Sequence, residues 1–403
     1  MTALHIAQRV QRIKPSPSGA ASDRAQELKR QGRDLVNLVV GEPDFDTPAH
    51  IREAAITALN HGETRYPHNW GTPALRAAIA RKLERENALQ YPVEQILVTH
   101  GAKSAIFLAL SATLDAGDEV IVPAPYWVSY PDMVVANDGV PVIVRCAQAT
   151  GFKLTAAQLR EAITPRTRWL LINSPANPTG ATYSAAEYRA LADVLLEHPQ
   201  VMVMTDEIYE HIRYDGRDNP HILAVEPALR ERTLIVNGVS KSYAMTGFRI
   251  GFVAGPVALV KAIAKLKSQS AGTSCSISQA AAVAAYDGGE AFIEHSRATY
   301  QARRDHAVAQ VNAIPGLDCS PPEGAFYLYV NCAGLIGLRT PQGEVLSDDQ
   351  AVVLYMLEHA GVALVAGAAY GLSPYFRASI ATSMENLELG IARMAQAVAA
   401  LAR

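Results

Sequence analysis

Several features are scarce in the 403-residue chain, and each scarcity excludes a class of protein. The four cysteines lie far apart and form no CxxC pair, so neither a disulfide framework nor a zinc cluster is indicated. No apolar run reaches the roughly 18 residues of a membrane span, and the first residues lack the apolar core of a signal peptide. The net charge of -3 offers no basic surface to nucleic acid. We therefore expect a cytoplasmic protein that binds no membrane, nucleic acid or metal.

Nucleotide-binding motifs are missing as well. Neither GxGxxG nor GxxxxGK[ST] occurs, so dinucleotide and nucleoside triphosphate sites lose their main support. Hydrophobic residues make up 49% and charged residues 19%, which are ordinary values for a globular protein. The length favours two domains, or one large domain with an appended lobe.

The chain does contain a repeated alternation of apolar runs and helical patterns. The runs have strand length and end in polar or glycine-rich turns, as in EVIVPAP, WLLINSP, VMVMTDE, TLIVNG and RIGFVAG. This alternation predicts an α/β fold with an open, mostly parallel sheet and helices on both faces. We predict a large domain over residues 48–289, a smaller α+β domain over residues 290–403, and an N-terminal arm, residues 1–47. We expect this arm to pack with the smaller domain rather than with the sheet.

Polar residues follow several of these runs, at the sheet edge where ligands of such folds bind. Asp206 follows VMVMT, although an aspartate there is also an ordinary helix N-cap. Lys241 follows TLIVNG closely, and an isolated lysine in that place is commonly a surface residue. A lysine behind a buried strand can instead be desolvated, which lowers its pKa and suits Schiff-base formation with a carbonyl. The glycine turn in THGAKSA opens a helix and offers its N–H groups to an anion, though glycine also serves turns for conformational reasons.

Six motifs occur in order: VGEPDFDTP at 40–48, GETRY at 62–66, PAPYWVSYPDM at 123–133, NPTG at 177–180, TDEIYE at 205–210 and SKSYAMTGFRIG at 240–251. With them the chain resembles, nearly end to end, a class I aminotransferase of fold type I, in the bacterial branch related to aspartate and prephenate aminotransferases. The resemblance implies pyridoxal 5'-phosphate (PLP) as cofactor. It also implies that an amino group passes from an L-amino acid, aspartate or glutamate, to a 2-oxo acid by a ping-pong mechanism.

The resemblance implies roles for individual residues around the cofactor. Lys241 forms the Schiff base and then moves the substrate proton, Asp206 pairs with the pyridine nitrogen, and Tyr209 hydrogen-bonds the phenolic oxygen. Asn177 also hydrogen-bonds the phenolic oxygen, and Trp127 stacks on the pyridine ring of the cofactor. The phosphate group is held by a set of backbone and side-chain groups at Gly101, Ala102, Lys103, Ser240, Arg249 and, from the second subunit of a homodimer, Tyr66.

The same resemblance implies where the substrate binds. Arg377 grips both oxygens of the substrate α-carboxylate, beside Gly41, Asn177 and Trp127. Lys103 matches a position near the distal carboxylate of dicarboxylic substrates. Ser18 is a further substrate-binding candidate, and Ser18 and Gly19 in KPSPSG depart from the usual pattern of the pocket wall. His68 and Trp70 in PHNWG depart from it near the mouth of the site, where they are also typical of loop surface, and SQSAGTSCS at 268–276 lacks a distal-carboxylate arginine.

Other functions remain open on these motifs. A β-lyase would use Lys241, Asp206 and Arg377 in the same way, and an aminotransferase could prefer aromatic or small neutral amino acids. A PLP-sensing regulator shares the fold, but no basic helix-turn-helix segment precedes the first motif. We interpret His100 and His211 as structural, because the lysine already supplies a base.

Overall fold

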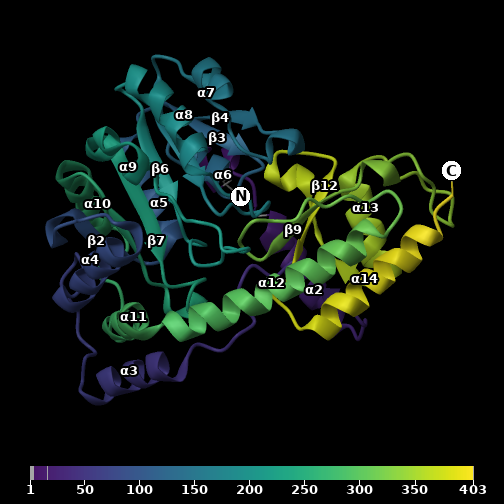
Figure 1. The fold of residues 1–403 in the computed structure, drawn as a ribbon, viewed down its shortest axis with the longest axis horizontal. Helices are drawn as coiled ribbons and strands as arrows, with labels where there is room; N and C mark the ends of the chain where they lie inside the picture. Colours follow the sequence, from purple (N-terminus) through teal and green to yellow (C-terminus); the bar gives the residue numbers. More distant parts are fainter. Residues whose placement is uncertain (1–3, 16, 403) are drawn as a thin grey trace.

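The computed structural model describes residues 4–15 and 17–402, and its centre is a seven-stranded sheet (Figure 1). The strand order is β2-β8-β7-β6-β5-β3-β4, and all neighbours from β7 to β4 run parallel. β8 runs antiparallel to both β2 and β7. The prediction of an α/β fold with a mostly parallel sheet is confirmed. The strands are β2 (Ile96–Thr99), β3 (Glu119–Ala124), β4 (Val140–Arg145), β5 (Thr167–Asn173), β6 (Met202–Asp206), β7 (Thr233–Gly238) and β8 (Gly251–Ala254).

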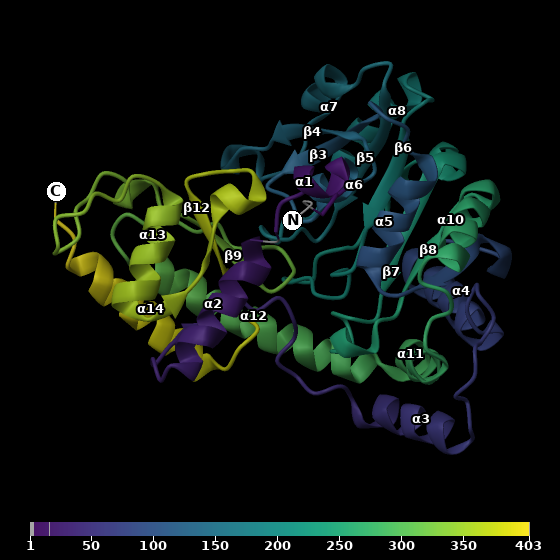
Figure 2. The same ribbon diagram turned by 180° about the vertical axis from the view of Figure 1, so that it is seen from behind.

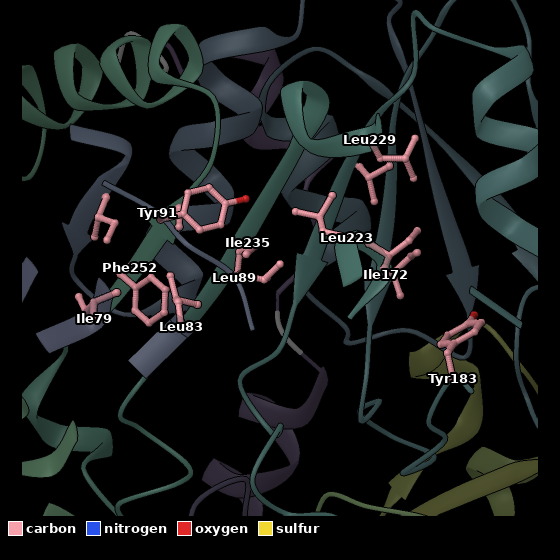
Figure 3. Close-up of a cluster of buried hydrophobic side chains, with 14 of the residues drawn as sticks. Ile79, Leu83, Leu89, Tyr91, Ile172, Tyr183, Leu223, Leu229, Ile235 and Phe252 are labelled. Carbon is pink, nitrogen blue, oxygen red and sulfur yellow. The ribbon is translucent and has the colours of Figure 1, made fainter. Parts of the chain in front are cut away.

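Helices cover both faces of this sheet because successive strand side chains point to opposite faces. Val120 and Val122 pack on one face with the first set of helices, and Ile121 packs on the other with the second set. Figure 2 shows the first set in front of the sheet, and Figure 3 shows part of the core under the second. The first set is α5 (Ala102–Thr113), α6 (Tyr130–Ala136) and α10 (Val257–Gln269). The second is α4 (Pro73–Asn87), α7 (Ala156–Ala162), α8 (Ala185–Glu197), α9 (Ile222–Val225) and α11 (Ser276–Gly288).

Local sequence signals explain where these helices begin and end. The Ser184 hydroxyl accepts from the Glu187 N–H, and the Glu187 carboxylate accepts from the Ser184 N–H, which is a capping box at the start of α8. Thr72 caps α4 and Pro73 occupies its first turn, where a missing N–H costs nothing. None of the helices in the described ranges combines the length and the apolar character that a bilayer span requires.

A second layer of structure joins the two ends of the chain beside the sheet. β1 (Val36–Asn37) pairs in parallel with β10 (Val362–Ala363), and β9 (Tyr327–Asn331), β12 (Tyr375–Ser379) and β11 (Val365–Ala366) form an antiparallel sheet. The long helix α12 (Glu290–Asn312) runs from below the large sheet into this second part (Figure 1). Further helices are α3 (Ala49–Asn60), α13 (Asp349–Tyr355) and α14 (Met384–Ala399), with a π-helical turn at Met356–Ala360.

The N-terminal segment differs in part from the expectation that it packs with the second part of the chain. α2 (Pro17–Arg30) does contact β10 and β11. The short helix α1 (Gln8–Arg12) packs against α6 on the large sheet instead. The Lys14 N–H donates to Asp132 at 3.0 Å, and Arg12 pairs with Asp138. Two polar contacts to α6 and its following turn thus draw the start of the chain away from the second part.

Candidate active site

The carboxyl ends of three neighbouring parallel strands bring the predicted polar residues to one edge of the sheet. Asp206 is the last residue of β6, and Lys241 lies just beyond the end of β7. Asn177 follows β5, where its backbone N–H donates to the Asn173 side chain at 2.8 Å. Since β5, β6 and β7 are adjacent and parallel, their following turns meet over one crevice.

This crevice is a cavity of about 540 Å³ between the sheet edge and the second part of the chain. It takes side chains from both ends of the sequence. Its lining is Gly19, Gln26, Asn37, Val39, Val40, Gly41, Glu42, Ala102, Lys103, Trp127, Tyr130, Asn173, Asn177, Asp206, Ile208, Tyr209, Ser240, Lys241, Thr246, Arg249, Tyr327 and Arg377. Most of the predicted site residues therefore share one cavity.

Asp206 lies at the bottom of the cavity and is 4% exposed. Burial raises its pKa to about 6, although the Tyr130 hydroxyl donates to its Oδ2 at 2.6 Å and the Ile208 N–H donates to its Oδ1 at 3.3 Å. Desolvation outweighs these two bonds because a charged group loses most of its hydration at such a depth. The ionised form of Asp206 therefore lacks a full counter-charge, and a cationic ring nitrogen would supply one.

Lys241 faces the same cavity from the turn after β7. Burial lowers its pKa to about 8, and the positive charges of Arg249 and Arg377 act in the same direction. Glu42 and Asp206 oppose that change. The amine donates to the Gly41 carbonyl oxygen at 2.6 Å. A lysine with such a pKa has a far larger neutral fraction near neutral pH than an ordinary lysine, so it can act as a nucleophile toward an aldehyde.

The start of α5 forms a concave set of donors with Arg249. Gly101 caps the helix with a φ of 86°, and a Cβ atom on it would lie 2.5 Å from Nη2 of Arg249. A Cβ atom on Gly251 would lie 2.7 Å from the Ala102 nitrogen. Arg249 itself donates to the carbonyl oxygens of Thr246 at 2.8 Å and His100 at 3.2 Å. The positive φ favours glycine at Gly101, and the backbone contact requires it at Gly251. The first N–H groups of α5, which lack partners within the helix, suit a phosphate.

Arg377 lies on β12 and reaches the cavity from the second part of the chain. Its Nη2 donates to the Val39 carbonyl oxygen at 2.6 Å, and its Nη1 donates to Asn177 at 3.2 Å. The guanidinium carbon is 4.3 Å from the centroid of the Tyr327 ring. The buried Nε of Arg377 has no hydrogen-bond partner among the described residues. The guanidinium therefore keeps donor capacity for a carboxylate.

Aromatic rings form the remaining wall. The Tyr209 and Tyr327 hydroxyls are 2.9 Å apart, and burial raises the pKa of Tyr209 well above its usual value. The Trp127 ring meets the Tyr130 ring edge to face, with 5.2 Å between centroids. The Lys103 ammonium lies 4.9 Å from the centroid of the Trp127 ring. Burial lowers the pKa of Lys103, and the positive charge of Arg249 lowers it further.

Some predicted residues lie elsewhere. Tyr66 is 94% exposed and does not line the cavity in this single chain. The side chain of Ser18 lies outside the described part of the structure, whereas Gly19 lines the cavity. His68 and Trp70 do not line it; Trp70 packs beside Arg76, with 5.5 Å from ring centroid to guanidinium carbon.

Sequence reasoning did not single out several residues that the fold brings to the cavity. Tyr130, whose hydroxyl donates to Asp206, is the first residue of α6 and stands in the motif PAPYWVSYPDM, which was an available signal. Of the others, Glu42 and Thr246 stand in quoted motifs and Asn173 ends an apolar run, whereas Gln26, Asn37 and Tyr327 reach the cavity through packing between distant segments.

A second group of titratable side chains lies behind the site. The carboxylates of Glu86 and Glu210 and the His211 ring could together hold a metal ion by their spacing. The fully buried Lys82 ammonium already bonds Glu210 and lies 3.4 Å from Glu86. The His211 ring bonds the hydroxyl of Ser242, next to Lys241, at 2.8 Å. This group joins α4 to the turns after β6 and β7, and a lysine supplies its positive charge.

The site residues fit PLP. A nucleophilic lysine, a buried carboxylate without a full counter-charge and a glycine-lined anion cradle match the aldehyde, the pyridine nitrogen and the phosphate of this cofactor. The unpartnered Nε of Arg377 matches the carboxylate of an amino acid. Fold and site together therefore define a class of protein, the PLP-dependent enzymes that act on amino acids.

Comparisons with known proteins identify the family within that class. Residues 33–394 match the family model described as aminotransferase class I and II. The chain is 50% identical to the aspartate/prephenate aminotransferase of Cereibacter sphaeroides, over 95% of this chain and 96% of that one. The crystal structure of the aspartate aminotransferase from Rhizobium meliloti superposes with a TM-score of 0.97 at 49% identity, over 99% of this chain and 100% of that one.

A further solved structure, the Thermus thermophilus aspartate aminotransferase with maleate, has a TM-score of 0.91 at 42% identity, over 98% of this chain and 100% of that one. The chain belongs to the class I and II aminotransferases, and it is a PLP-dependent aminotransferase. Its substrates are accordingly an amino acid and a 2-oxo acid. The expected resemblance, cofactor and reaction class are thereby confirmed.

Proposed function

We propose that the chain transfers the amino group of a dicarboxylic L-amino acid, aspartate or glutamate, to a 2-oxo acid. The observation that carries this proposal is the position of Lys103. Its ammonium lines the cavity with Arg377, and it forms no ion pair among the residues that the structure describes. One cation can then meet the α-carboxylate and the other the distal carboxylate.

The charge of the cavity supports the same choice. Its lining carries four cationic side chains, Lys103, Lys241, Arg249 and Arg377, and two carboxylates, Glu42 and Asp206. Four minus two leaves a balance of two positive charges, which favours anionic ligands. The relatives named above are aspartate or aspartate/prephenate aminotransferases, and the Thermus thermophilus structure was solved with maleate, which is itself a dicarboxylate.

We propose the following work for the side chains. Arg377 and Asn177, with the backbone of Gly41, orient the α-carboxylate of the amino acid. Tyr209 and Asn177 donate to the phenolic oxygen of the cofactor, and Asp206 holds the proton on its pyridine nitrogen. When bound, the cofactor supplies an electron sink that stabilises negative charge on the substrate Cα.

Lys241 then performs the proton transfer. With the cofactor in place, its amine would take the proton from the substrate Cα and later give it up again, so that one group would serve as base and acid in turn. Trp127 excludes water from the ring, and the start of α5 with Ser240 and Arg249 holds the phosphate. After the first half-reaction the cofactor-loaded enzyme would hold the amino group. The 2-oxo acid would then bind in a second, separate half-reaction, which is a ping-pong mechanism.

We also propose a homodimer in which Tyr66 of one subunit completes the phosphate site of the other. An exposed tyrosine at the end of the GETRY motif supports this role, since 94% of its surface is uncovered in the single chain.

The domain division at residues 47 and 289 remains our proposal as well. It is supported by the β1–β10 pairing of the two chain ends and by a hydrophobic core that joins them.

The test of the proposed function is the absorbance of the cofactor-loaded protein after addition of single amino acids without a 2-oxo acid. Aspartate or glutamate should convert the visible band of the aldehyde form to the amine form, and 2-oxoglutarate should restore it. Conversion by phenylalanine or alanine alone would overturn the dicarboxylate proposal. Pyruvate and ammonia from a β-substituted amino acid, without restoration by a 2-oxo acid, would indicate a β-lyase.

A substitution of Lys103 tests the observation directly. Lys103→Ala should lower kcat/KM for aspartate roughly 10- to 100-fold, the loss expected for one charge-assisted bond, and should change that for alanine little. Lys261→Ala, on an exposed position of α10, is the matched control. Equal losses for aspartate and alanine would show that Lys103 does not read the distal carboxylate.

A further inference from the structure

The segment from Gly41 to Thr47 lies across the turn that carries Lys241. The Lys241 amine donates to the Gly41 carbonyl oxygen at 2.6 Å, and the Thr246 hydroxyl donates to Oε2 of Glu42 at 2.7 Å. The Thr47 hydroxyl donates to the Ala244 carbonyl oxygen at 2.5 Å. Three hydrogen bonds therefore join this segment to residues 241–246.

The other side of the same segment is fixed to α12. Asp44 forms a two-pronged ion pair with Arg303, with both oxygen–nitrogen distances at 2.9 Å. Phe45 packs between the rings of Phe292 and Tyr300, with centroid distances of 5.8 and 5.3 Å. A bidentate guanidinium pair of this kind restricts orientation as well as distance. The segment is thus held on both sides, and the Glu42 side chain has a defined place in the cavity wall.

Charged side chains that line the cavity with Lys241 act on its amine in opposite directions. Arg249 and Arg377 disfavour the ammonium form, whereas Glu42 and Asp206 favour it. In the proposed function Asp206 pairs with the ring nitrogen, so its charge is neutralised there. Glu42 is then the remaining carboxylate of this group that can balance the two arginines.

We propose that Glu42 is a positioning residue for Lys241. Its carboxylate holds the turn through Thr246, and it contributes a negative charge to the cavity that the amine faces. The proposal rests on the proposed role of Lys241. It assigns two separable contributions to one side chain, a hydrogen bond and a charge. Substitutions that remove only one of them can distinguish the two.

The experiment follows uptake of added PLP by the apo-protein by its absorbance, as a function of pH. Glu42→Gln keeps an oxygen for Thr246 but loses the charge. The ammonium of Lys241 then loses stabilisation, so the acid limb of the uptake profile should move to lower pH by roughly half a unit to one unit. Glu42→Asp keeps the charge, so its profile should stay close to that of the wild type.

Thr246→Val tests the hydrogen bond alone. Its uptake profile should keep the wild-type midpoint, while the KM for the amino acid should rise roughly three- to tenfold because the segment is held less firmly. Asp46→Asn is the matched charge control, since Asp46 is exposed on the same segment and does not line the cavity. Thermal unfolding of each apo-protein shows that the variants are folded.

The outcomes distinguish the role of Glu42 from that of Lys241. A Glu42→Gln profile that coincides with the wild type, or an equal shift in Asp46→Asn or Thr246→Val, would overturn the role of Glu42. PLP uptake with the wild-type spectrum by Lys241→Ala would instead overturn the proposed role of Lys241 itself. A shift confined to Glu42→Gln, with rescue by Glu42→Asp, is the expected result.

Discussion

We predict that the ionised side chain of Asp206 destabilises the folded protein when no cofactor is bound. Burial raises its pKa from 3.8 to about 6, so the folded apo-protein holds this proton more tightly than the unfolded chain does. The stability that this proton contributes is fully present below the unfolded pKa and is lost as the pH rises through the folded one. A difference of roughly two units corresponds to about 3 kcal/mol at neutral pH.

Asp206→Asn removes this ionisation while keeping the shape of the side chain. The Tyr130 hydroxyl can still donate to an oxygen at that position, so the buried hydrogen bond survives. The difference in unfolding free energy between the variant and the wild type should therefore rise by roughly 2 to 2.5 kcal/mol between pH 4 and pH 7 and stay level above. Affinity for PLP should fall in the same variant, because an amide cannot balance a ring cation.

Urea unfolding of both apo-proteins across this pH range measures the difference, and other titrating groups cancel in the comparison. Asp46→Asn, an exposed carboxylate, should show no such pH-dependent gain. A difference for Asp206→Asn that is the same at pH 4 and at pH 7 would refute the reasoning. It would mean that Asp206 titrates alike in the folded and unfolded chain.

Three further substitutions test the site. Lys241→Ala should leave the protein folded and abolish transamination, and turnover at the wild-type rate in a kinetic assay would contradict its role. Arg377→Lys should lower kcat/KM for all amino acids by roughly 10- to 100-fold and raise KM, because the two-pronged grip is lost; unchanged kinetics would place the anchor elsewhere. Gly251→Ala should weaken PLP binding at least roughly tenfold, since its Cβ would lie 2.6 Å from the Gly101 carbonyl carbon. Gly247→Ala, with open space around it, is the control for the same titration, and equal affinities would contradict the close approach.

The local pattern of the sequence was sufficient for the sheet and its covering helices, since apolar runs of strand length alternate with helical periodicity. It could not give the direction of β8, which is antiparallel although its apolar run looks like those of the parallel strands. Direction depends on how the chain returns to the sheet, and a four-residue run has no feature that encodes it. The packing of α1 on α6 was missed for the same reason, because it rests on contacts between segments far apart in the chain.

For the site, motifs and their resemblance to a known family were sufficient to name Lys241, Asp206 and Arg377. The apolar run before Asp206 and Glu207 does not by itself tell which of these two carboxylates faces the crevice. In the folded chain Asp206 lines the cavity, whereas Glu207 pairs with His221 at 2.7 Å. Adjacent side chains at a strand end point to opposite sides, and only the packed sheet defines which side is the cavity.

The sequence by itself therefore determined the kinds of chemical group available and the strand ends after which they stand. The tertiary structure decided their pKa values and their partners. Burial makes Asp206 a weaker acid and Lys241 a better nucleophile, and burial is a property of the assembled fold. The contacts of Tyr130 with Asp206 and of Thr246 with Glu42 join residues from distant parts of the chain, so they exist only once the chain has folded.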